Sequence, residues 1–198
     1  MIDVDKILAV HKNCTADWHI EINLQEDELP WKFIEENHQW NFCLWHEEDI
    51  VRIQDLEAIR IVKAKRNIDN FNQKRNDAIE KIDEWILLYL NMLNVREQEK
   101  MHSETPGMMI DRLSIMSLKR YHMVEETLRP DASDEHKLTC QQKVIILDRQ
   151  IADLANCLLE LFQMLETGQL KFKVYRQFKM YNDPNLNPEL YMRNQKSI

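Results

Sequence analysis

The scarcity of glycine constrains this chain more than any other feature, because only Gly107 and Gly168 occur among 198 residues. Parallel α/β folds and phosphate-binding loops need glycine where the backbone turns sharply or approaches a ligand. Neither a G-x-G-x-x-G nor a G-x-x-x-x-G-K sequence is present. Hairpin-rich β folds need Gly, Asn and Asp turns at short intervals, and the chain lacks them. The sequence therefore predicts a mostly helical protein.

Apolar residues recur at three- and four-residue steps along most of the chain, which is the spacing of one helical face. Thr105 and Pro106 are typical of a helix start, and Gly168 of a helix end. Between Pro30 and Pro106 there is no glycine or proline, so the two helices in that interval are expected to be nearly continuous. The predicted helices cover residues 3–23, 31–53, 55–96, 106–128 and 133–167.

The fold expected from this pattern is an all-α antiparallel bundle of about five long helices in a single domain over residues 1–198. The apolar seam from Val144 to Leu165 alternates steps of three and four, which is typical of helices packed at a shallow angle. Such a seam is either internal or the contact of a homodimer. Residues 169–198 form a basic, aromatic tail that is expected to pack on the acidic bundle; its pattern leaves strand and helix open.

Net charge, cysteine content and apolar runs limit the partners and the cellular compartment that the sequence predicts. The net charge of −8 argues against nucleic-acid binding by the whole protein. The four cysteines are far apart, as expected for reduced thiols in a cytoplasmic protein. No signal peptide is recognisable at the N-terminus. The longest uncharged apolar run, residues 85–95, is much shorter than the roughly 20 residues that span a bilayer, so no membrane span is expected.

Polar side chains form a band on the helix predicted over residues 55–96, beside its apolar stripe. Asparagine is a poor residue for a helix interior, because its side chain competes for backbone hydrogen bonds, yet four asparagines occur within positions 67–76. Arg75 stands where the stripe requires an apolar residue, and a buried guanidinium needs acceptors. The band is interpreted as a buried network that fixes helix register, as a cleft for an anionic or sugar-like ligand, or as a solvated face.

Under the cleft interpretation, the chemistry divides by residue type. Arg66 and Arg75 would supply directional donors to phosphate. Asn41, Asn72 and Asn76 would supply amide contacts to hydroxyl groups. Carboxylates would orient the basic groups. The candidate ligand-binding residues are Asn41, Glu48, Arg52, Lys65, Arg66, Asp69, Asn72, Arg75, Asn76, Asp77, Asp111, Arg112 and Lys119.

Candidates for catalysis are fewer. His122, grouped with Asp111 on its helix, and Glu48 are the residues considered as a general base. Glu48 together with Glu80 and Asp83 would hold Mg²⁺ if the protein were an enzyme of phosphate-ester chemistry. Otherwise the sequence predicts no cofactor and no metal site.

Three stretches resemble a bacterial domain-of-unknown-function family whose members have about the length of this chain. The resemblance implies a helical fold, no established activity, and genes that lie beside glycosyltransferases of cell-surface polysaccharide assembly. Its motif residues coincide with the polar positions above, which favours a ligand site. The stretches are Asn41-Phe-x-Leu-Trp45-His-x-Glu48-Asp49-x-x-Arg52, Lys65-Arg66-x-Ile-Asp69-x-x-Asn72-Gln73-x-Arg75-Asn76-Asp77-x-Ile-Glu80, and Glu104-Thr-Pro106-Gly107-x-x-Ile-Asp111-Arg112-Leu-Ser114-Ile-x-Ser-Leu-Lys119 with His122.

Together these observations predict a cytoplasmic binding or accessory protein of cell-surface polysaccharide synthesis. Its polar cleft would hold an anionic or sugar-nucleotide ligand, or a partner glycosyltransferase. Two alternatives stay open: an enzyme of phosphate-ester or sugar-nucleotide chemistry at the same cleft, and a structural scaffold with a buried polar network.

Overall fold

The computed structural model of the protein describes residues 2–95, 100–178, 180 and 183–195. Within these residues the fold is all-α, as predicted. The β-type hydrogen bonding among them is an isolated bridge between Met101 and Lys171. The helices are α1 (Val4–Trp18), α2 (Trp31–Val51), α3 (Ala58–Met92), α4 (Pro106–Leu128), α5 (Asp134–Glu166) and α6 (Pro188–Gln195).

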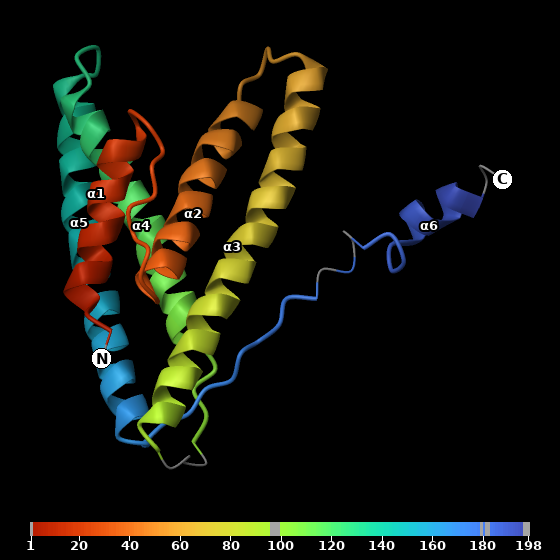
Figure 1. The fold of residues 1–198 in the computed structure, drawn as a ribbon. Coiled ribbons are helices and arrows are strands. Elements are labelled where there is room, and N and C mark those ends of the chain that lie inside the picture. Colours follow the sequence, from red (N-terminus) through yellow and green to blue (C-terminus); the bar gives the residue numbers. More distant parts are fainter. Residues whose placement is uncertain (1, 96–99, 179, 181–182, 196–198) are drawn as a thin grey trace.

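Two antiparallel helical hairpins, α2–α3 and α4–α5, diverge in a V, and α1 packs beside α4 and α2 (Figure 1). Helix α4 is central, because it contacts α1, α2, α3 and α5. Its buried residues Ile110 and Leu113 join Ile34 of α2, Ile82 of α3 and Leu158 of α5 in the main apolar core. A smaller core around Trp18, Phe42 and Leu118 lies between α1, α2 and α4.

The ends of α4 and α5 agree with the local capping signals. The Thr105 hydroxyl accepts a hydrogen bond from the Met108 N–H, and Pro106 occupies the first turn of α4. The Ser133 hydroxyl accepts from the His136 N–H at the start of α5. Gly168 follows that helix with a φ of 71°, the left-handed conformation that glycine adopts at helix ends. These boundaries depend on contacts between residues that are close in sequence, so the sequence predicts them well.

Two predicted boundaries are wrong. Helix α1 ends at Trp18 and not at residue 23. In the non-helical stretch that follows, the buried carboxylate of Glu35 accepts hydrogen bonds from the backbone N–H groups of Gln25 and Glu26 at 2.8–3.0 Å, which ties this stretch to α2. Helices α2 and α3 are not continuous: residues 52–57 form a non-helical connection without any glycine or proline. Helix α3 covers Ala58–Met92 instead of 55–96; residue 96 lies outside the described residues.

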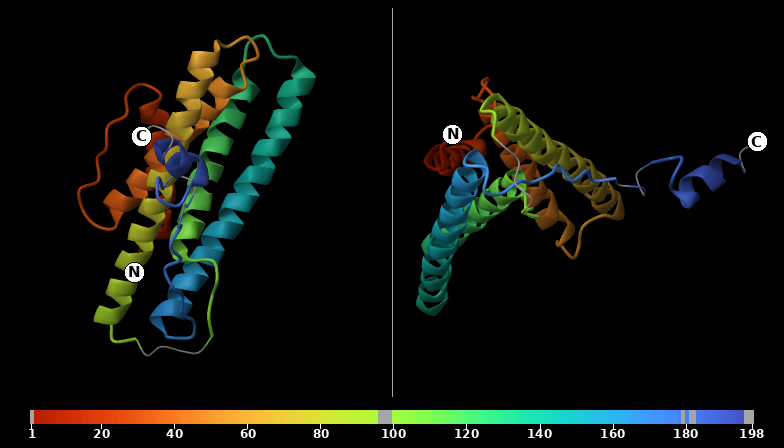
Figure 2. Two further views of the ribbon diagram at one scale, coloured as in Figure 1. Left: turned by 90° about the vertical axis from the view of Figure 1, so that its right-hand side faces the viewer. Right: turned by 90° about the horizontal axis from the view of Figure 1, so that it is seen from below.

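The C-terminal tail begins on the bundle and is irregular over residues 172–178. Leu170 and Phe172 are buried in the main core. Arg176 forms ion pairs with Glu80, at 2.8 Å, and with Glu84. These ion pairs join the basic tail to two carboxylates of α3, but α6 lies apart from the bundle in Figure 1 and in the right-hand view of Figure 2.

All four cysteines are unpaired, and each lies in a helix. The described helices include none whose length and apolar character would let it cross a bilayer.

Candidate functional site

Asp111 of α4 is the centre of a polar cluster between α2, α3 and α4. Its side chain is almost fully buried, and Oδ1 accepts hydrogen bonds from Asn37 Nδ2 at 2.9 Å and from Asn41 Nδ2 at 2.8 Å. Arg75 Nε on α3 lies 3.9 Å from the same oxygen, which is beyond hydrogen-bond distance. The two amides therefore satisfy Oδ1, and Arg75 contributes only Coulombic attraction.

The cluster continues toward α1 as a directional chain of hydrogen bonds. Asn41 Nδ2 also donates to Ser114 Oγ at 3.0 Å, and Ser114 Oγ lies 2.8 Å from His38 Nδ1. His38 Nε2 lies 2.9 Å from Thr15 Oγ1, which itself donates to the His11 carbonyl at 2.7 Å. Because the Thr15 proton is engaged, His38 Nε2 must donate and His38 Nδ1 must accept. Burial lowers the pKa of His38 well below its usual value, in agreement with a neutral ring.

Arg75 separates two pockets in the groove between the α2–α3 hairpin and α4. The first has a volume of about 480 Å³ and the second about 320 Å³. The Arg75 side chain is 26% exposed, yet its Nε is buried and has no hydrogen-bond partner among the described residues. The first pocket is lined by Asp69, Asn72, Arg75, Asn76, Ile79, Glu80, Asp83, Met108, Tyr175 and Gln177. The second is lined by Asn41, Leu44, Trp45, Glu48, Asp49, Arg52, Arg75, Ile115 and Leu118.

Amides are the uncommitted polar groups of the first pocket. Within the described part of the chain, the side chains of Asn72 and Asn76 form no hydrogen bond, although Asn76 is only 7% exposed. Two acids of the pocket are already paired: Asp69 Oδ1 with Lys65 Nζ at 2.5 Å, and Glu80 with the tail. The pocket thus offers to a ligand the guanidinium of Arg75 and the amides of Asn72 and Asn76, beside the tail residues Tyr175 and Gln177.

Asp83 closes the inner end of the first pocket, where α3 meets the start of α4. Its Oδ1 accepts a hydrogen bond from the Gly107 N–H at 2.7 Å. Burial raises the pKa of Asp83 to about 7, against the lowering effect of hydrogen bonds from Thr105 and Gly107. A Cβ on Gly107 would lie 2.8 Å from both Asp83 Oδ1 and the Ile79 carbonyl oxygen, so glycine permits this close approach of α4 to α3.

The structure brings together part of the predicted residue set. Asn41, Arg75 and Asp111 meet at the centre of the groove, and residues of both pockets flank them. Glu48 and Arg52 form an exposed ion pair of 3.0 Å at the edge of the second pocket. Five predicted residues line neither pocket and are exposed: Lys65, Arg66, Asp77, Arg112 and Lys119.

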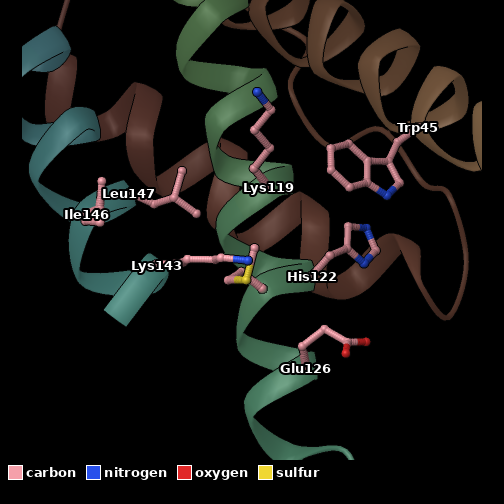
Figure 3. Close-up of a pocket in the computed structure, with 8 residues that line it drawn as sticks. Trp45, Lys119, His122, Glu126, Lys143, Ile146 and Leu147 are labelled. Atoms are coloured by element: carbon pink, nitrogen blue, oxygen red, sulfur yellow. The ribbon is translucent and has the colours of Figure 1, made fainter. Parts of the chain in front are cut away.

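His122 does not join Asp111, although both residues belong to α4. Its Nδ1 lies 2.7 Å from Glu125 Oε2, and its ring stacks on Trp45 at a centroid distance of 4.9 Å. It lines a separate pocket of about 500 Å³ between α4 and α5, with Lys119 and Lys143 (Figure 3). His122 is therefore outside the groove that contains Arg75.

Sequence reasoning missed several polar partners and a second cluster. Asn37 and His38 lie four and three residues before Asn41, which places them on the same face of α2, and this spacing was the available signal. His19 and His46 lie beside His122, with ligand atoms of all three within 4.8 Å of one another. No sequence signal links these three histidines, because they come from three separate parts of the chain.

A model of the family described as "Protein of unknown function (DUF4254)" matches residues 31–174. The chain belongs to this family. The resemblance seen in the three polar stretches is thereby confirmed as membership of a family of unknown function. The family region contains α2 to α5, and with them Arg75 and Asp111, whereas α1 precedes it. No match was found among curated proteins or among solved structures.

Proposed function

We propose that the protein binds a small anionic ligand with several hydroxyl groups, such as a sugar nucleotide, in the groove around Arg75. The main support for this proposal is that the Arg75 Nε is buried and has no hydrogen-bond partner among the described residues. An unsatisfied buried donor costs about 1–3 kcal/mol. Asp111 does not relieve this cost, because it is 3.9 Å away and accepts from two amides. A phosphate or carboxylate of a ligand would supply the acceptor.

The residues around Arg75 could bind the hydroxyl groups and the ring of such a ligand. Asn72 and Asn76 present amide groups to the first pocket, and amides can both donate to and accept from sugar hydroxyls. Trp45 lines the second pocket and offers an aromatic surface for a sugar ring or a base. The two pockets together have a volume in the range that is typical of small-molecule sites.

The proposed role is that of an accessory protein of cell-surface polysaccharide synthesis in the bacterial cytoplasm. Its support is the resemblance, which implies genes beside glycosyltransferases, the enzymes that use sugar nucleotides as donors. A glycosyltransferase is the proposed protein partner. Self-association through the outer face of α5 is proposed from the exposed side chains of Leu138, Ile145 and Ile146, and light scattering on the pure protein measures it.

An enzyme acting on phosphate esters is the second candidate, and Asp83 is the observation that favours it. A carboxyl group with a pKa near 7 beside a polar pocket is suited to general acid–base catalysis at neutral pH. Glu80, one of the carboxylates expected to hold Mg²⁺, is engaged by Arg176 and by the Gln177 N–H. Release of phosphate or nucleoside monophosphate from sugar nucleotides, with and without Mg²⁺, distinguishes this candidate from simple binding. Such release from the wild type, abolished in Asp83→Asn, would establish the enzyme.

The binding proposal is tested by a thermal-shift panel of uridine and guanosine diphosphate sugars, followed by calorimetry on any ligand that stabilises the protein. At 100 times its Kd a ligand adds about 2.7 kcal/mol of stability. Arg75→Gln removes a charge-assisted hydrogen bond of about 1.5–3 kcal/mol, which corresponds to a roughly 10- to 150-fold weaker Kd. The matched control is Arg66→Gln, because Arg66 lies on the same helix, is exposed and lines neither pocket.

A second variant guards against an indirect effect of Arg75 on folding. Asn72→Ala removes an amide that has no hydrogen-bond partner in the described part of the chain, and alanine is the better helix former. Its melting temperature should therefore not fall below that of the wild type, while its affinity for the ligand falls. Equal affinities of wild type, Arg75→Gln and Arg66→Gln would refute the site. No stabilisation by any member of the panel would refute the ligand class.

A further inference from the structure

We propose that His19, His46 and His122 form a binding site for a divalent transition-metal ion, with Zn²⁺ as the probe. The three residues come from different parts of the fold: His19 directly follows α1, His46 belongs to α2, and His122 to α4. One ring nitrogen of each lies within 4.8 Å of the others. None of the three histidines lines the groove around Arg75, although Trp45 lines its second pocket and also stacks on His122. The metal site is therefore distinct from the proposed ligand site.

Hydrogen bonds leave the outer nitrogen of two of these rings ready to bind a metal. His19 Nδ1 lies 2.6 Å from the Thr15 carbonyl oxygen, and a carbonyl oxygen can only accept. His122 Nδ1 lies 2.7 Å from Glu125 Oε2, and an ionised carboxylate likewise only accepts. Both Nδ1 atoms are therefore protonated donors in the neutral rings, and each Nε2 carries the lone pair. Histidine ligands of metal sites are oriented by this same pattern of carbonyl and carboxylate acceptors.

The lone pair of His122 lacks a partner. Its Nε2 is buried and has no hydrogen-bond partner among the described residues. A buried imidazole nitrogen loses its hydrogen bonds to water, and without a donor beside it no interaction offsets this cost. A metal ion beside it would supply the missing interaction. This observation is independent of the proximity of the three rings.

The spacing of the rings fits coordination of one ion. An imidazole nitrogen lies about 2.0–2.1 Å from zinc, which places the ring centroid roughly 3.2 Å from the ion. Two rings at the tetrahedral angle then have centroids about 5.2 Å apart. The observed centroid distances are 5.2 Å for His19–His46, 5.2 Å for His19–His122 and 5.6 Å for His46–His122.

Aromatic neighbours hold the rings in these orientations. Tyr121 stacks on His19 at 4.6 Å, and Trp45 stacks on His122 at 4.9 Å. The Phe42 ring lies against His46 at 4.4 Å and against His19 at 5.0 Å. Such packing reduces the reorganisation that metal binding requires.

The electrostatic setting also suits a cation. Burial and, after it, the two neighbouring histidines lower the pKa of His46, a direction that favours the neutral form in which histidine binds metals. Asp49 and Glu125 act on His46 in the opposite direction, and these carboxylates would partly balance the charge of a bound ion.

The donor set indicates which ions fit. Three imidazoles without thiolate suit Zn²⁺, Cu²⁺ or Ni²⁺ and disfavour Mg²⁺ and Ca²⁺, which take oxygen ligands. In the described residues the group contains three protein ligands. Zinc sites with three protein ligands keep their fourth position for water or a substrate group. The site would therefore leave one position on the ion open to exchange.

The test uses full-length protein freed of any affinity tag and treated with a chelator. Titration with Zn²⁺ in a calorimeter should show one ion per chain, and Co²⁺ should give the visible absorption of a four-coordinate site. His19→Ala, His46→Ala and His122→Ala should each weaken Zn²⁺ binding by more than 100-fold. Glu125→Ala, which removes the acceptor that orients His122 but no metal ligand, should weaken it by about 10- to 100-fold.

His136→Ala is the matched control, because His136 is bonded to Glu126 and takes no part in the cluster; its affinity should equal that of the wild type. His19 is exposed and follows the helix, so His19→Ala tests the site without disturbing the core, with circular dichroism to verify folding. Folded His19→Ala that binds Zn²⁺ as tightly as the wild type would overturn the proposal. So would a wild type that takes up no stoichiometric Zn²⁺, or a loss of binding in His136→Ala equal to that in the cluster variants.

Discussion

His11 gives the sharpest prediction about stability, because it is a titratable side chain in the core without any polar partner. It is fully buried, both ring nitrogens have no hydrogen-bond partner among the described residues, and its ring stacks on His38 at 4.7 Å. Burial lowers its pKa from 6.5 to about 3. In the folded protein His11 is therefore neutral, whereas in the unfolded chain it binds a proton below pH 6.5. This group makes stability fall as the pH is lowered from 6.5 toward 3.

The size of the effect follows from the shift. Each pH unit between the two pKa values is worth about 1.4 kcal/mol, so His11 lowers the free energy of unfolding by about 2 kcal/mol between pH 7 and pH 5. His38, whose pKa is also lowered, acts in the same direction. Asp83 opposes both, because its raised pKa of about 7 makes the folded state bind its proton more tightly than the unfolded chain does. The wild type alone therefore does not reveal the contribution of His11.

The assay compares His11→Phe with the wild type by urea denaturation at pH 7 and pH 5. Phenylalanine retains an aromatic ring beside His38 but has no nitrogen to protonate. The difference in unfolding free energy, variant minus wild type, should be more favourable to the variant at pH 5 by about 2 kcal/mol. Because this quantity is a difference between two pH values, any constant packing cost of the new ring cancels. The same difference at both pH values would refute the assignment of a neutral, buried His11.

The remaining predictions concern the junction of α3 with α4 and the start of α5. Asp83→Asn should show the opposite sign: relative to the wild type it should lose about 2 kcal/mol of stability between pH 7 and pH 5 in the same assay, and a pH-independent difference would contradict the raised pKa. Gly107→Ala should destabilise by about 1–3 kcal/mol in urea, because the new Cβ meets the Ile79 carbonyl; a stabilised variant would show that the helices separate freely. Ser133→Ala removes the acceptor of the His136 N–H and should cost about 1 kcal/mol in thermal or urea unfolding, and an unchanged midpoint would argue that the cap is not formed.

The parts of the fold that could be predicted are those determined by neighbours in sequence. Helix α4 starts with Thr105 and Pro106, and α5 is bounded by Ser133 and Gly168, because a capping side chain or a left-handed glycine acts within one turn. The apolar seam of α5 indicated its packing for the same reason. From Leu154 to Leu165 its seam residues are buried.

The parts that were missed depend on residues distant in sequence. The helical pattern continues past Trp18, yet the stretch after α1 is non-helical, and Glu35 of α2 accepts hydrogen bonds from its backbone N–H groups at Gln25 and Glu26. No local rule reports a partner ten residues away. The three histidines illustrate the same limit, because only the packing of α1, α2 and α4 brings them together.

Part of the predicted polar band of α3 faces the groove and part is exposed to solvent, for a geometric reason. Arg75 and Asn76 lie where α3 passes α4, and they face the groove, as the pattern indicated. Lys65 and Arg66 precede this point, on the part of α3 where the hairpins diverge, and they are exposed (Figure 1). Helical periodicity shows which face a residue occupies, but it does not show where along the helix a neighbouring helix ends.

The structural and ligand-binding interpretations of the polar cluster do not exclude each other. The chain from Asn41 through Ser114 and His38 to Thr15 satisfies its own donors and acceptors, and it connects α2, α4 and α1 in one register. That register holds Asp111 opposite Arg75 but leaves the Arg75 Nε without a partner. A network built only for register would be expected to satisfy its most expensive donor. Among the described residues, the polar cluster leaves two buried atoms without a hydrogen-bond partner, the donor Arg75 Nε and the acceptor Asn37 Oδ1. The unsatisfied donor lies beside two pockets, and it is therefore the strongest reason to seek a ligand in this groove.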